Sequence, residues 1–72
     1  MKKYFVIYYT SRRPLFFKIS FVEGEDPMTA LRKFVNNKEY IVAASLYESQ
    51  EDFLQGNSPL VHYERERTFV YL

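Results

Sequence analysis

Apolar residues recur at helical spacing in one long stretch, residues 26–37, with the sequence DPMTALRKFVNN. Asp26 is a favourable N-cap residue, and Pro27 suits the first helical position, where its missing N–H has no partner to lose. Asn36 and Asn37 can end the helix because asparagine tolerates the left-handed backbone conformation. The helix has about three turns and needs a packing partner to be stable. Its apolar stripe is formed by Met28, Leu31, Phe34 and Val35.

The rest of the apolar pattern is typical of β-strands, and it predicts four of them. Residues 3–10 are apolar on both faces, which favours a central strand. Residues 15–22 alternate, and this alternation predicts that one set of side chains faces the helix. Residues 40–47 form the third strand, with Tyr40, Val42, Ala44 and Leu46 as its inner face. The set of residues 15–22 expected to face the helix is Leu15, Phe17, Ile19 and Phe21.

The C-terminal third of the chain contains a short helix and a long strand. Residues 49–55 predict the helix, with Ser49 as its cap, Asp52 at the capping-box position and Gly56 just past its end. Residues 60–72 then read as one bent or bulged strand, because no Gly or Asn is present where a hairpin turn would need one.

These elements predict a single α+β domain spanning residues 1–72. A turn at residues 11–14 makes the first two strands an antiparallel hairpin. The right-handed crossover rule makes the third strand parallel to the second, and its simplest place is beside the first. The predicted fold is a two-layer ββαβ(α)β sandwich. Its sheet is four-stranded and mostly antiparallel, in the order 2-1-3-4, with the main helix and the short helix on one face.

Composition limits the chemistry that this domain can perform. Seventy-two residues bury only about 60% of their unfolded surface. No Cys is present, so a disulfide or a thiolate zinc site is impossible, and seven Phe and seven Tyr must supply the core instead. A single His and scattered acids do not make a metal site. We expect no metal and no cofactor.

The charge of the chain excludes two classes of function. Ten Lys and Arg against nine Asp and Glu give a formal charge of +1. This near-balance argues against an acidic DNA mimic and against a purely electrostatic nucleic-acid binder. Low net charge with many aromatic residues favours self-association. The apolar run near the N-terminus, residues 4–9, is short and rich in Tyr, so we expect a cytoplasmic protein with no membrane segment.

His62 is the one candidate catalytic base. A base needs an orienting partner and a nucleophile nearby, and the sequence does not place either beside His62. A histidine between Val61 and Tyr63 in a strand is more often a half-exposed structural residue. We therefore expect a protein that is not an enzyme.

The candidate interaction surface is the sheet face opposite the predicted helices. Its aromatic and basic side chains suit two partners: another protein, including a second copy, or single-stranded RNA or DNA. An uncovered apolar sheet face is a liability for a monomer, so a homo-oligomer or protein-interaction module, with a possible regulatory or inhibitory role, is the favoured interpretation. Arg12 and Arg13 form a basic tip that fits either partner. The surface comprises Tyr4, Val6, Tyr8, Phe16, Lys18, Arg65 and Arg67.

Overall fold

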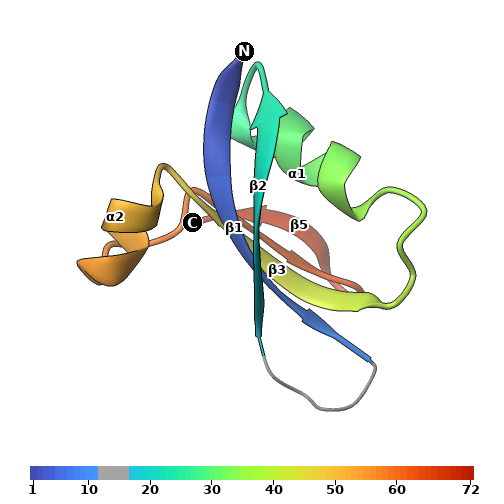
Figure 1. The fold of residues 1–72 in the computed structure, drawn as a ribbon. Helices are drawn as coiled ribbons and strands as arrows, with labels where there is room; N and C mark the ends of the chain where they lie inside the picture. Colours follow the sequence, from blue (N-terminus) through green and yellow to red (C-terminus); the bar gives the residue numbers. More distant parts are fainter. Residues whose placement is uncertain (12–16) are drawn as a thin grey trace.

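The computed structural model describes residues 1–11 and 17–72, which form a small α+β domain with one antiparallel sheet and two helices (Figure 1). The predicted α+β class is therefore confirmed, whereas the two-layer, four-stranded arrangement is not. The strands are β1 (Lys2–Thr10), β2 (Lys18–Gly24), β3 (Ile41–Tyr47), β4 (Val61–Glu64) and β5 (Thr68–Tyr71). The helices are α1 (Pro27–Val35) and α2 (Gln50–Leu54). The predicted turn at residues 11–14, except Ser11, lies outside the described residues, as do Leu15 and Phe16.

The capping residues read from the sequence delimit both helices. Asp26 caps α1, where its Oδ1 atom accepts a hydrogen bond from the Thr29 N–H at 2.8 Å. Asn37, just after α1, has a φ of +59°, the left-handed conformation that closes the helix. Ser49 caps α2 by accepting from the Asp52 N–H, and Gly56 follows with a φ of +80°. Both helices are thus confirmed.

Capping also affects the carboxyl groups of these turns. Hydrogen bonds from the backbone N–H and the hydroxyl of Thr29 lower the pKa of Asp26. Hydrogen bonds from the Ser49 hydroxyl and then the Asn57 amide lower the pKa of Asp52. In both turns the charged carboxylate is the form that the folded chain prefers.

The sheet has the order β2-β1-β3-β4-β5, and every neighbouring pair is antiparallel. The predicted order of the first four strands is confirmed, with β1 in the central role that its two apolar faces indicated. The prediction of one long C-terminal strand was wrong, because β4 and β5 form a hairpin.

The conformation of the β4–β5 turn explains why the hairpin could not be recognised from the sequence. The Arg67 N–H donates to the Glu64 carbonyl oxygen at 2.9 Å, and Thr68 follows with a φ of +60°. A tight turn followed by one left-handed residue is a common three-residue hairpin connection, usually with Gly in the left-handed position. Here a β-branched residue holds that position, so no Gly or Asn marks the turn.

The main core lies between α1 and the sheet, and it uses the face that we had predicted to be open. Tyr4 is 4% exposed and Val6 is fully buried, together with Leu31 of α1. Tyr8 packs edge-on against Phe34, with ring centroids 5.0 Å apart. The buried members of this core are Tyr4, Val6, Ala30, Leu31, Ile41, Ala44, Leu46 and Val61.

The prediction of the inner face of β2 was therefore wrong. Ile19 and Phe21 are about half exposed, on the side away from α1, and Phe17, just before β2, is also about half exposed. Gly24 shows the physical reason, because a Cβ atom there would lie 2.7 Å from the Ala30 Cβ atom. Only a glycine lets α1 approach the strand this closely, and Gly24 shares its face with Val22 rather than with Phe21.

The two helices lie on opposite sides of the sheet (Figure 1). Phe53 of α2 packs on Phe5 and Tyr47, with ring centroids 5.7 and 5.3 Å away. Both residues alternate along their strands with side chains of the α1 core, such as Val6 and Leu46. The predicted placement of both helices on one face was wrong.

Candidate protein interface

The side of the sheet away from α1 carries an apolar surface, which we call the outer face. The strand registers place Ile19, Ile7, Ser45, His62 and Val70 in one row across all five strands. Phe21 and Phe5 lie in the row on one side of it, and Tyr9 lies on the other. The outer face is thus formed by Phe5, Ile7, Tyr9, Ile19, Phe21, Ser45, His62 and Val70.

Helix α2 covers only one end of the outer face. Phe5, under the Phe53 ring, is 1% exposed, and Ile7 is 7% exposed between its neighbours. The side chains towards the sheet edges remain accessible: Tyr9, Ile19, Phe21 and Val70 are 42–51% exposed. Exposed apolar side chains gathered on one face of a sheet are typical of a contact site.

A chain of hydrogen bonds crosses the outer face beside this apolar surface. The Ser45 Oγ atom and the His62 Nδ1 atom are 2.7 Å apart, and the His62 Nε2 atom lies 3.1 Å from a Glu64 carboxylate oxygen. A neutral ring can accept from the serine and donate to the carboxylate. A protonated ring can donate to both. The arrangement therefore satisfies His62 in either protonation state.

The order serine, histidine, carboxylate invites comparison with nucleophilic hydrolases. Such chemistry also needs N–H donors aimed at the oxyanion that forms on the substrate. Ser45 is paired with Ile7 on one side and with His62 on the other, so its backbone lies within two strand ladders. The Ser45–His62–Glu64 contacts therefore form a polar link between β3 and β4 on the outer face.

The surface predicted from the sequence does not exist as one patch. Tyr4 and Val6 lie in the core, and Tyr8 is half-buried under Phe34. Lys18 is exposed on β2, at one edge of the sheet, whereas Arg65 and Arg67 are exposed in the β4–β5 turn, at the other. Phe16, Arg12 and Arg13 lie outside the described residues.

The residues that do form the outer face were visible as an alternating pattern in the sequence. The alternation of residues 15–22 led us to place Ile19 and Phe21 on the side that faces the main helix. The signal that identifies the true inner face is Gly24, since a missing side chain beside a short connection indicates close approach of the helix. Nothing in the sequence paired Ser45 with His62.

Two further observations concern other classes of site. Within residues 1–11 and 17–72, no group of three His, Cys, Asp or Glu residues could hold a metal ion. Neither helix of the described chain is long and apolar enough to span a bilayer.

Comparison of the chain with protein-family models, with curated proteins and with solved structures finds no match.

Proposed function

We propose that this protein is a non-enzymatic interaction module that self-associates through the outer face. The observation that supports the proposal is the exposure of Tyr9, Ile19, Phe21 and Val70, each between 42 and 51%, on a sheet face that α2 covers at one end only. A cytoplasmic location remains part of the proposal, in keeping with a sequence that has no Cys.

A second copy of the chain suits this face because the central row is self-complementary. Its members are apolar except for Ser45 and His62, whose polar atoms already bond to each other. Charged residues lie near the margins, where Lys3 pairs in register with Glu23 and places its ammonium 5.5 Å from the Phe21 ring centroid. A two-fold contact would therefore bring apolar rows together, and the Glu64 carboxylate beside the central row is already bonded to His62.

The available area is consistent with a modest dimer interface. A buried aromatic ring covers about 150–250 Å², so the half-exposed rings and their aliphatic neighbours offer on the order of 300–400 Å² per copy. Two copies would remove about twice this apolar area from water, and a polar rim would add to it. The total approaches the roughly 1,000 Å² that a specific interface needs.

The test uses neighbouring residues of β2 that point to opposite sides of the sheet. Ile19→Glu places a charge in the outer face, whereas Lys18→Glu places one on the α1 side. In sedimentation and light scattering, wild type and Lys18→Glu should have about twice the mass of one chain at micromolar concentration. Ile19→Glu should have the mass of one chain, 8.7 kDa.

A wild-type protein that stays at 8.7 kDa over the whole concentration range would rule out self-association. Dissociation by Lys18→Glu but not by Ile19→Glu would place the contact on the α1 side of the sheet and contradict a contact through the outer face. Circular dichroism of both variants shows that any change in mass arises in a folded chain.

A further inference from the structure

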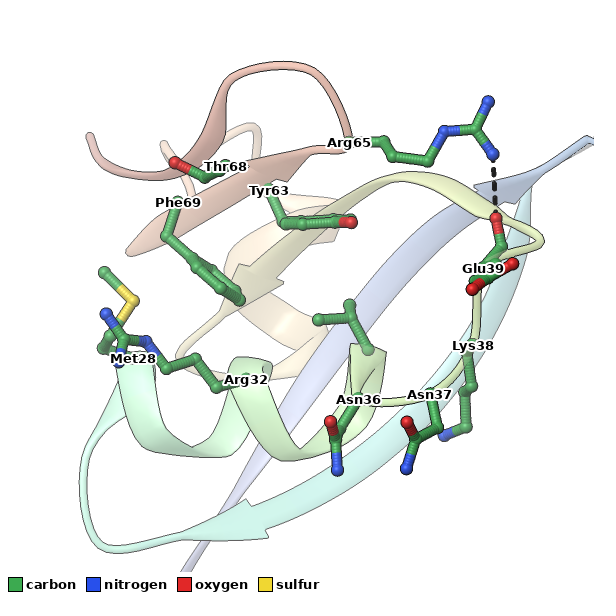
Figure 2. Close-up of a pocket in the computed structure, with 11 residues that line it drawn as sticks. Met28, Arg32, Asn36, Asn37, Lys38, Glu39, Tyr63, Arg65, Thr68 and Phe69 are labelled. Carbon is green, nitrogen blue, oxygen red and sulfur yellow. Dashed lines mark hydrogen bonds between the residues drawn. The ribbon is translucent and has the colours of Figure 1, made fainter.

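A second candidate site lies on the α1 side of the sheet, opposite the outer face. A groove of about 670 Å³ runs between α1, with the loop that follows it, and the β4–β5 hairpin (Figure 2). This volume lies within the range of small-molecule sites, about 300–1,000 Å³. Tyr63 and Phe69 line it from the hairpin and also pack against the α1 core.

The groove has an aromatic wall. Tyr63 and Phe69 are directly opposite each other on β4 and β5, and their ring centroids are 5.0 Å apart. Figure 2 shows both rings projecting from the hairpin towards α1. Each side chain is half-buried, so the pair is held in place while part of its surface remains open to a ligand.

Two arginines flank these rings. The Arg32 guanidinium lies 5.2 Å from the Phe69 ring centroid. Arg65 reaches across to the loop after α1, where its Nη1 atom donates to the Glu39 carbonyl oxygen at 2.8 Å (Figure 2). That bond uses one of the five N–H donors of a guanidinium. Figure 2 therefore shows a basic group at each end of the aromatic wall.

The groove carries more cationic than anionic side chains, with the Asp26 carboxylate acting on Arg32 electrostatically from outside the groove. Neither Arg32 nor Arg65 forms an ion pair with a carboxylate of residues 1–11 or 17–72. Two guanidinium groups, those of Arg32 and Arg65, thus line the groove beside one carboxylate, that of Glu39. Lys38 also lines the groove, but its ammonium lies over the Phe34 ring, 4.4 Å from the centroid. An excess of this kind, beside exposed ring surface, suits an anionic ligand with a planar ring.

We propose that this groove binds a nucleoside phosphate, either free or as one residue of a single strand. The base would stack against the Tyr63–Phe69 pair or the Arg32 guanidinium plane, both of which are common platforms for unpaired bases. The phosphate would take the remaining donors of Arg65. A base within a duplex has no free face for this contact, so double-stranded nucleic acid is excluded as the ligand.

The first experiment compares a groove residue with a matched neighbour outside the groove. Binding of a fluorescein-labelled single-stranded oligonucleotide is followed by anisotropy at low salt, for wild type, Arg65→Gln and Arg67→Gln. Both arginines are exposed and belong to the same turn, but only Arg65 lines the groove. Arg65→Gln should weaken binding about tenfold through loss of a charge-assisted contact, whereas Arg67→Gln should change it less than about twofold.

Competition experiments separate the two sources of the ligand. Displacement of the oligonucleotide by adenosine monophosphate at similar concentrations of nucleotide residues would assign the groove to the free nucleotide. Displacement only by unlabelled single strand would assign it to nucleic acid, with a log–log salt slope of about −0.7 for the one phosphate contact of Arg65. Ribose 5-phosphate, which has no base, should not compete.

Three outcomes would overturn the proposal: no binding of either ligand at low salt, equal weakening by Arg65→Gln and Arg67→Gln, or equal competition by ribose 5-phosphate. Equal weakening by the two variants, or equal competition by ribose 5-phosphate, would mean that the chain attracts anions non-specifically. The result is independent of self-association, because the groove and the outer face lie on opposite sides of the sheet. Ile19→Glu should therefore bind the oligonucleotide as wild type does.

Discussion

Thr68 opens β5 with a φ of +60°, a conformation that costs a β-branched residue about 1–2 kcal/mol. Its hydroxyl donates to the Arg67 carbonyl oxygen at 2.6 Å, which recovers part of this cost. Thr68→Asn should raise the free energy of unfolding by about 1 kcal/mol, because asparagine tolerates the left-handed region. The urea midpoint measures the change.

Thr68→Val is the matched control for this strain. Valine keeps the branched Cβ atom and removes the hydroxyl, so it should lower the urea midpoint. If Thr68→Asn also lowered the midpoint, the left-handed position would not be a source of strain in the folded chain.

Gly24 shows how one small residue fixes the separation of two elements. A Cβ atom there would lie 2.7 Å from the Ala30 Cβ atom and 2.8 Å from its Cα atom. Because one of these neighbours is helix backbone, a side chain at Gly24 must displace α1. Gly24→Ala should cost about 1–3 kcal/mol, a typical effect of overpacking. Thermal unfolding at a fixed protein concentration tests this, and an unchanged Tm would contradict the close contact.

At the scale of elements, the helix caps predict how stability depends on pH. The pKa of Asp26 is lowered below its ordinary value of 3.8 in the folded chain, chiefly by the backbone N–H of Thr29. A lowered pKa contributes stability above the ordinary value, and this contribution is lost as pH falls through the folded value. Tm should therefore drop as pH is lowered from about 4 towards about 2.

Replacing the capping carboxylate isolates this contribution. Asn caps helices as well as Asp does but carries no titrating group, so Asp26→Asn should reduce the fall of Tm with acid. Glu25→Gln removes a neighbouring carboxylate that is not the cap, and it should keep the wild-type slope. Equal slopes in wild type and Asp26→Asn would show that the cap is not linked to protonation.

The accuracy of sequence prediction differed among elements for physical reasons. Caps are local, so Asp26 and Ser49 located both helices correctly. Strand pairing was predictable where turns and crossovers allow few alternatives, which gave the order of the first four strands. The β4–β5 hairpin was not predicted because Thr68 adopts the left-handed backbone conformation, which is rare for a β-branched residue.

At the scale of the whole molecule, the orientation of the sheet was the main error. Both faces of β1 are apolar, so side-chain polarity cannot say which face α1 covers. The choice depends on close packing of Gly24 against Ala30, a contact between elements that periodicity does not report. Part of the surface that we predicted to be exposed is therefore buried in the core, and the partly uncovered apolar face is the opposite one, the outer face.

Self-association through the outer face also predicts how Tm depends on protein concentration. If unfolding separates two chains, mass action raises Tm with protein concentration. An unfolding enthalpy of about 0.7 kcal/mol per residue implies a rise of about 5 °C for each tenfold increase. Differential scanning calorimetry over about a hundredfold range of concentration should show this rise for wild type and for Arg65→Gln, whose replaced side chain lines the groove instead of the outer face. Ile19→Glu should unfold at one temperature at every concentration. A wild-type Tm that does not depend on concentration would contradict self-association, because the folded chain would then be stable without a second copy.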